Sequence, residues 1–260
     1  AKNTERPREV VLRSLKDAIE AKGTKVSGKA LKPVAAFSAQ VELFTELFPE
    51  GFQDPEWKEE HRVNTSGRTL KRHRDPVVQQ VQETLSREEC EDLLAEGRHE
   101  DLVLAVREIL SGTSLVPIGA VKALKGLDKE KSQAFAEAVF NVLHGEGSFD
   151  DRFDAYLASL GEILGSKPSW RLATALPALM DPQKQVCVRR SVFLRQAASV
   201  APTARYSKQA RAGSYRNFRR VAFAVKKRLE AQGLKPADLL DIHDFIWVTL
   251  RNAAMENLTD

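Results

Sequence analysis

The segment LLDIHDFIWVTL, residues 239–250, carries apolar side chains on nearly every side of a helix. A surface helix has one apolar stripe, whereas a helix that is apolar all round lies inside a protein. These residues are therefore predicted to form the buried central helix of the C-terminal half, within a helical pattern from Ala237 to Leu258. Its apolar members are Leu239, Leu240, Ile242, Phe245, Ile246, Val248 and Leu250.

The rest of the 260-residue chain shows the same helical periodicity. Apolar residues recur at spacings of three and four, most of the glycines and prolines fall between the periodic segments, and strand-like alternation is hard to find. The fold class is therefore expected to be all-α, a multi-helix protein of about ten helices. They are predicted at residues 8–22, 32–48, 76–96, 99–111, 129–144, 150–165, 169–180, 184–198, 214–232 and 237–258.

A polar and basic loop, residues 58–75, interrupts the helical patterns and has Thr65-Ser66-Gly67 in its middle. Such a change of composition is typical of a boundary between subdomains. The chain is therefore predicted to have an N-terminal helical segment, residues 1–75, and a main helical domain, residues 76–260.

Composition points to a cytoplasmic protein. Hydrophobic residues make up 42% of the chain and charged residues 29%, the first residues are charged, and no stretch reaches the roughly 18 apolar residues of a membrane span. The two cysteines, Cys90 and Cys187, lie far apart and are expected to be reduced thiols. No cofactor and no membrane partner are expected, and the oligomeric state is left open.

Charge is strongly segregated along the chain. Residues 182–229 are forty-eight consecutive residues without one Asp or Glu, and they contain thirteen Lys and Arg. Because the whole chain is only +4, the other 212 residues sum to −9. An acidic N-terminal part and a basic C-terminal part are therefore predicted. The basic part is expected to bind an anionic partner, with a plain solvated face as the alternative.

A helix over 214–232 has Phe218, Val221, Ala222, Val225 and Leu229 on one face and arginines on the other. Arginine neutralises phosphates and aromatic rings stack on bases, so this region is predicted to bind nucleic acid, DNA in preference to RNA, without catalysis. The expected contacts are Arg189, Arg190, Arg195, Arg205, Tyr206, Lys208, Arg211, Tyr215, Arg216, Arg219, Arg220, Phe223 and Lys227, with Arg216, Arg219, Arg220 and Lys227 at the centre. A second basic arm is expected at Arg68, Lys71, Arg72 and Arg74.

Two alternatives remain open from the residues. The basic region would also suit an acidic protein partner, or the acidic segment from Glu83 to Glu108, which carries a net charge of −6. A metal-dependent phosphohydrolase would use Asp238, Asp241, His243 and Asp244 as an Asp/His ligand cluster. Phosphate-binding loops, dinucleotide fingerprints and zincin motifs are absent from the sequence.

Three stretches resemble a family of uncharacterised bacterial proteins that is sometimes found near restriction and defence genes. They are FPEGFQDP at 48–55, the segment from Trp170 to Pro182, and DIHDFIWV at 241–248. The family pattern has a Lys-Pro pair where this chain has residues 188–191, and Gln in place of His243. The resemblance implies a prokaryotic role near DNA, in genome maintenance or defence, and no catalytic residues.

Overall fold

The computed structural model describes residues 36–63, 67 and 70–258. The contacts within the chain divide it into two compact units, residues 1–33 and 34–260, and the following description concerns the second unit alone. Its described residues form thirteen α-helices, one 3-10 turn and one π-helical turn, and no strand, which confirms the all-α fold class. None of the described helices has both the length and the apolar character of a membrane span.

The first part of the unit is an aromatic cluster built by short elements. They are α2 (Phe37–Leu47), the 3-10 turn η1 (Gly51–Gln53), α3 (Pro55–Trp57) and the π-helix η2 (Lys58–Arg62). The indole of Trp57 is fully buried, with the rings of Phe44, Phe48 and Phe52 at 5.1 to 5.3 Å between centroids. This cluster packs on Phe245 of the central helix, so it shares one core with the C-terminal half.

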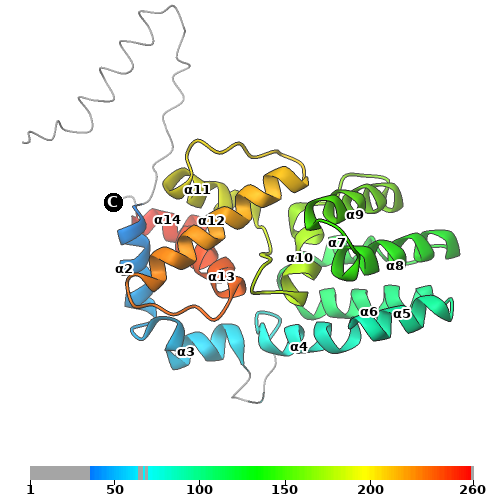
Figure 1. Cartoon of the computed structure of the whole chain (residues 1–260). Coiled ribbons are helices and arrows are strands. Elements are labelled where there is room, and N and C mark those ends of the chain that lie inside the picture. The colour runs from blue at the N-terminus through cyan, green and yellow to red at the C-terminus, as the bar shows by residue number, and fades with distance from the viewer. Residues whose placement is uncertain (1–35, 64–66, 68–69, 259–260) are drawn as a thin grey trace, which may run out of the picture. The chain divides into compact units, whose positions relative to one another are not determined.

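The middle of the chain forms a group of packed helices at one end of the unit (Figure 1). They are α4 (Asp75–Thr84), α5 (Arg87–Ala95), α6 (His99–Gly112), α7 (Ile118–Lys122), α8 (Lys129–His144) and α9 (Phe149–Leu164). Ser86, Asp128 and Ser148 cap α5, α8 and α9, each accepting a backbone N–H of its first turn. The cap at Ser86 ends the single helix that was predicted over 76–96 and starts a second one.

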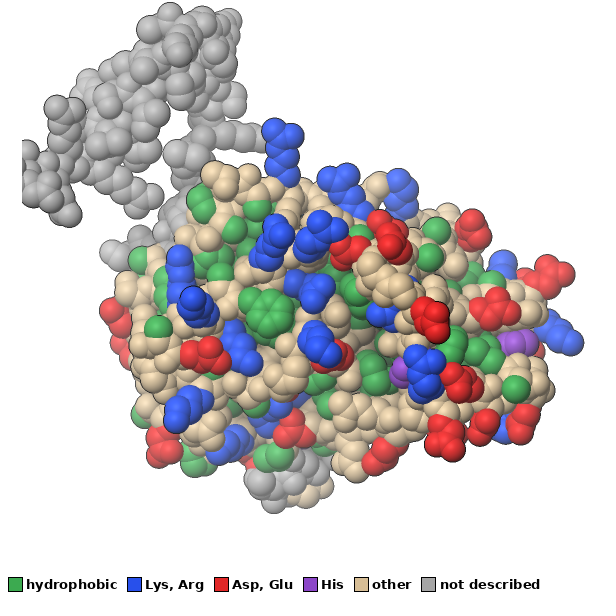
Figure 2. Space-filling model, viewed as in Figure 1, with side chains coloured by type: hydrophobic (Ala, Val, Ile, Leu, Met, Phe, Trp, Pro, Cys, Tyr) green, Lys and Arg blue, Asp and Glu red, His purple; other side chains and the backbone are tan. Residues whose placement is uncertain are grey.

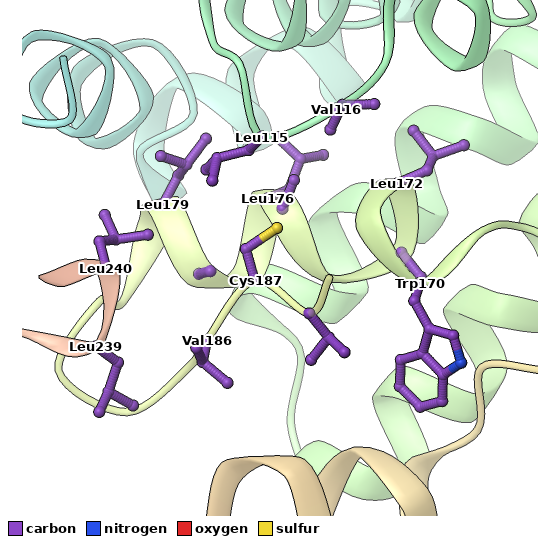
Figure 3. Close-up of a cluster of buried hydrophobic side chains, with 14 of the residues drawn as sticks. Leu115, Val116, Trp170, Leu172, Leu176, Leu179, Val186, Cys187, Leu239 and Leu240 are labelled. Carbon is purple, nitrogen blue, oxygen red and sulfur yellow. The ribbon is translucent and has the colours of Figure 1, made fainter. Parts of the chain in front are cut away.

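Helix α10 (Trp170–Met180) packs against α4 and α8 of this first group. The other end holds α11 (Arg190–Val200), α12 (Ala212–Glu230), α13 (Leu239–Leu250) and α14 (Asn252–Leu258). Helix α13 packs against α2, α11 and α12, and every residue in it except Trp247 is buried, which confirms the predicted central helix. Between α10 and α11 the backbone from Lys184 to Arg189 is non-helical, and Cys187 points from it into the apolar cluster on α10 (Figure 3).

Three boundary predictions differ from the structure. The helix expected over 184–198 begins only at Arg190, and the one expected over 237–258 is divided at Arg251 into α13 and α14. The helix expected over 8–22 lies outside the described residues. The loop predicted over 58–75 begins with the π-helix η2, which covers residues 58–62. The division at residue 75 stays a prediction; Arg62 and Arg74 on its N-terminal side bind Asp238 and Asp244.

Candidate functional site

The acid-free region, residues 182–229, contains the non-helical segment 184–189, helix α11, the loop 201–211 and helix α12. Lys and Arg side chains gather over α11 and α12, whereas acidic side chains are more frequent towards α5, α6 and α8 (Figure 2). The segregation of charge seen along the sequence is thus also present in space.

A groove of about 600 Å³ opens where the start of α10, the start of α11 and the loop 201–211 meet. We call it the basic groove, because every charged residue that lines it is a lysine or an arginine. These five cations are Lys167, Arg171, Arg189, Arg190 and Lys208, beside the neutral residues Pro168, Ser169, Trp170, Ser191 and Gln209.

The walls of the basic groove are held in place by hydrogen bonds to the backbone. The indole N–H of Trp170 donates to the carbonyl of Lys208 at 3.2 Å, and Nε of Arg190 donates to the carbonyl of Ser207 at 3.0 Å. The guanidinium of Arg171 donates to the carbonyls of Ser114 and Leu115. Because these contacts fix the loop and the guanidinium groups of Arg171 and Arg190 before any ligand arrives, these two cations are preorganised.

Arg189 is the cation of the groove whose charge is least offset by hydrogen bonds or ion pairs with described residues. Its guanidinium lies 3.5 Å from the ring centroid of Trp247, its buried Nε has no hydrogen-bond partner, and no ion pair joins it to an acid within the described ranges. Burial, and then the neighbouring charge of Arg171, lower the pKa of Arg189 to about 10. The side chain therefore stays charged at neutral pH, in surroundings that favour an incoming anion.

The cationic face predicted on α12 is divided by internal contacts. Arg216 forms an ion pair with Asp150, and Arg219 donates to the carbonyl of Lys184 at 3.0 Å while lying over the ring of Phe149. Arg220 and Lys227 are exposed and form no ion pair with described residues, and Phe223 is 41% exposed. Half of the predicted central face is thus occupied within the molecule.

The structure corrects the role predicted for Tyr215. This ring is fully buried, and its hydroxyl bonds to the backbone of Val186, so the prediction that it stacks on bases is wrong. The ring of Tyr206 is half-buried and packs on Phe218 at 4.6 Å between centroids. Arg195 donates to the carbonyl of Leu250, whereas Arg205, Lys208 and Arg211 are exposed.

The basic arm is also revised. Lys71 and Arg72 are exposed, but Arg72 pairs with Glu60 at 3.2 Å. Arg74 is 3% exposed and donates two hydrogen bonds to the carboxylate of Asp244, so its predicted place in a mobile phosphate-binding arm is wrong. Arg68 lies outside the described residues.

The Asp/His cluster of α13 is a buried network of internal pairs. Asp238 accepts two hydrogen bonds from Arg62, Asp241 accepts from the indole of Trp57, and Nδ1 of His243 donates to the carbonyl of Cys187 at 2.7 Å. In the part of the chain that the structure describes, no three His, Cys, Asp or Glu side chains are grouped to share a metal ion. The geometry of these residues is that of structural ion pairs, which buried charges require.

The acidic segment, residues 83–108, does not dock on the basic region within the molecule. Arg87 pairs with Glu91, and Arg98 pairs with Glu96 and Asp101, so this segment satisfies part of its own charge. Among the described residues, no ion pair joins it to residues 182–229.

Sequence reasoning missed Lys167 and Arg171, which line the basic groove. Both precede the acid-free region, so a count of charge along the chain does not include them. The signal that would have found them is their position around the capped start of α10, where Ser169 accepts the N–H of Leu172. No family model matches the chain, and no similar protein was found among the curated proteins or the solved structures.

Proposed function

We propose that this protein binds nucleic acid without catalysis, by holding phosphates in the basic groove and on the neighbouring exposed cations of α12. The observation that carries the proposal is the set of five Lys and Arg side chains around one groove with no lining acid. Lys and Arg side chains that neutralise phosphates supply most of the affinity in sequence-independent binding.

The groove favours backbone contacts over base stacking. Trp170 is its one aromatic lining residue, and this ring is 5% exposed with its N–H already bound to the loop. Contacts to phosphates position a protein on a strand but carry no sequence information directly. The expected binding is therefore weakly dependent on sequence and strongly dependent on salt.

The preference for DNA and a role in prokaryotic genome maintenance or defence belong to the same proposal. They rest on the family resemblance of residues 48–55, 170–182 and 241–248 and not on the geometry of the groove. The competing function, docking of an acidic protein, would use the same cations and is an outcome of the experiment below.

The test is fluorescence anisotropy of labelled single- and double-stranded DNA and RNA over a range of salt concentrations. Lys208→Ala and Lys167→Ala are expected to weaken binding and to lower the salt slope by about one for each lost phosphate contact. Lys122→Ala and Lys125→Ala, exposed lysines outside the groove lining, are the matched controls and should leave both quantities unchanged.

Equal loss in the groove variants and the controls would refute the groove as the site. If no nucleic acid binds at low salt while polyglutamate does, the surface is a docking site for acidic protein and the proposal is wrong.

A further inference from the structure

A second cavity, of about 320 Å³, shares Arg189 with the basic groove but has different chemistry. It lies between the end of α2, the π-helix η2, residues 72–74 and the C-terminal part of α13. We call it the His61 cavity. The lining residues that matter here are His61, Arg72, Arg74, Arg189, Asp244 and Arg251.

His61 is a buried imidazole without a hydrogen bond. It is 6% exposed and stacks on the indole of Trp57, with 4.1 Å between centroids. Its Nδ1 is 3.6 Å from Asp244 Oδ2 and its Nε2 is 3.8 Å from Glu60 Oε2, which is long for a hydrogen bond, although the imidazole is near enough to help lower the pKa of Asp244. Among the described residues, neither nitrogen has a closer partner. Since buried polar groups are nearly always satisfied, the nitrogens of this ring are available to an additional partner at the cavity wall.

The backbone around His61 is unusual as well. Residues 58–62 form a π-helical turn, which is closed by the bond from the N–H of Val63 to the carbonyl of Lys58. Short π-helical segments are rare in proteins overall, and those that occur are often found at functional sites. The carbonyl of His61 also accepts the N–H of Arg74 at 2.9 Å, so the backbone at His61 is fixed, and the ring stacks on Trp57 at the cavity wall.

The charges around the cavity leave an excess of unpaired cations. Asp244 neutralises Arg74, with two bonds of 2.7 and 2.8 Å, and Glu60 neutralises Arg72. Within the described ranges, Arg189 and Arg251 have no ion pair. Glu56 also lines the cavity and forms no ion pair with described residues, but its side chain is exposed to solvent.

Arg189 and Arg251 are placed to act together. The guanidinium of Arg189 lies on the indole of Trp247, and Arg251 follows Trp247 by four residues at the end of α13. Residues four apart lie on the same side of a helix, and both cations line this one cavity.

We propose that the His61 cavity binds a small phosphate monoester. A phosphate group offers three terminal oxygens and up to two negative charges, which match two guanidinium groups and one imidazole donor. The volume is at the lower end of the range for ligand pockets and leaves room for a small organic group on the phosphate. This inference does not rest on nucleic-acid binding, because His61 and Arg251 are not part of the basic groove.

The test is titration calorimetry of the full chain with AMP, adenosine, inorganic phosphate and glutarate. AMP is expected to bind, inorganic phosphate more weakly, and adenosine not at all. Binding of adenosine as tight as that of AMP, tighter binding of glutarate than of AMP, or no binding of AMP would overturn the proposal.

His61→Asn and Arg251→Ala are each expected to weaken AMP binding about tenfold or more, as the loss of a hydrogen bond to a charged group requires. Arg251 is exposed and its side chain has no hydrogen bond or ion pair with the described residues, so this variant keeps the test valid if His61→Asn fails to fold. Lys208 lines the basic groove but not the His61 cavity, so Lys208→Ala is the control. This variant should lose affinity for nucleic acid and keep its affinity for AMP. If Arg251→Ala binds AMP as well as the unchanged protein does, the cavity is not the site.

Discussion

The pair formed by Arg74 and Asp244 offers the sharpest test of how the unit is held together. Both side chains are almost fully buried, at 4% and 3% exposure, and two hydrogen bonds join them. Burial by itself would raise the pKa of Asp244, but Arg74 holds this pKa well below its ordinary value. The carboxylate is therefore ionised at every pH at which the protein is handled.

Asp244→Asn removes the negative charge and leaves the guanidinium of Arg74 buried without a counterion. Breaking a buried pair in this way costs about 3 to 5 kcal/mol of unfolding free energy. In a unit of this size each kcal/mol lowers Tm by about 2 to 4 °C, so a fall of roughly 6 to 20 °C is expected. The double variant Arg74→Met with Asp244→Leu should recover most of this loss, because no buried charge then remains unpaired.

The assay is urea unfolding followed by circular dichroism, with Glu91→Gln as the matched control. Glu91 pairs with Arg87 on the surface of α5, both side chains being more than half exposed, and its loss should cost less than about 0.5 kcal/mol. A cost for Asp244→Asn as small as that of Glu91→Gln would refute the argument that the pair is desolvated and interdependent.

Three further predictions test other parts of the unit. Burial lowers the pKa of His243 to about 4, so the unfolded state binds a proton more readily between pH 6.5 and 4. The contribution of His243 to stability should therefore fall by up to about 3 kcal/mol as pH drops through that window, against the opposite contribution of Asp241, whose pKa burial raises to about 6. His243→Gln should remove the His243 part of the pH dependence in urea unfolding. Burial raises the thiol pKa of Cys90 and of Cys187 to about 11. A disulfide reagent at pH 8 should therefore label neither thiol in the folded protein and both thiols in denaturant. Fast labelling without denaturant would contradict their burial. Arg189→Met should raise the unfolding free energy by on the order of 1 kcal/mol and should weaken the binding of nucleic acid and of AMP. A variant less stable than the unchanged protein would show that the guanidinium contributes to the fold.

Much of the helical fold could be predicted because it depends on local patterns. The inward face assigned to Phe218, Val221, Val225 and Leu229 is buried in α12, and the all-round apolar segment is the central helix. Local periodicity does not show where a helix is interrupted by a cap. For that reason the periodicity predicts one helix over 76–96, whereas in the structure Ser86 caps the start of α5.

The candidate site was harder to predict, because its charges are paired across long separations in the chain. Arg74 belongs to the basic arm that the sequence predicts, but its partner Asp244 is 170 residues away. The neighbouring Arg62 likewise pairs with Asp238, which is 176 residues away. Tyr215 lies between arginines in the sequence, yet the helix turns its ring into the core. Charge counted along the chain thus identified the basic region correctly and misjudged which of its members are available.

The contrast between Arg74 and Arg189 explains why the second of these is the better indicator of a ligand. Both line the His61 cavity, but Arg74 is hydrogen-bonded to the carboxylate of Asp244, whereas Arg189 lies on the face of Trp247 and interacts with that carboxylate without an ion pair. A cation over an aromatic ring gains about 0.5 to 2 kcal/mol. Because Arg189 is only partly buried, its desolvation costs less than the several kcal/mol of a fully buried unpaired charge. An apolar side chain would cover Trp247 without that cost, so packing alone does not account for an arginine there. An anion bound at this position would supply the missing compensation, and its removal should leave a protein that gains stability when Arg189 is made apolar.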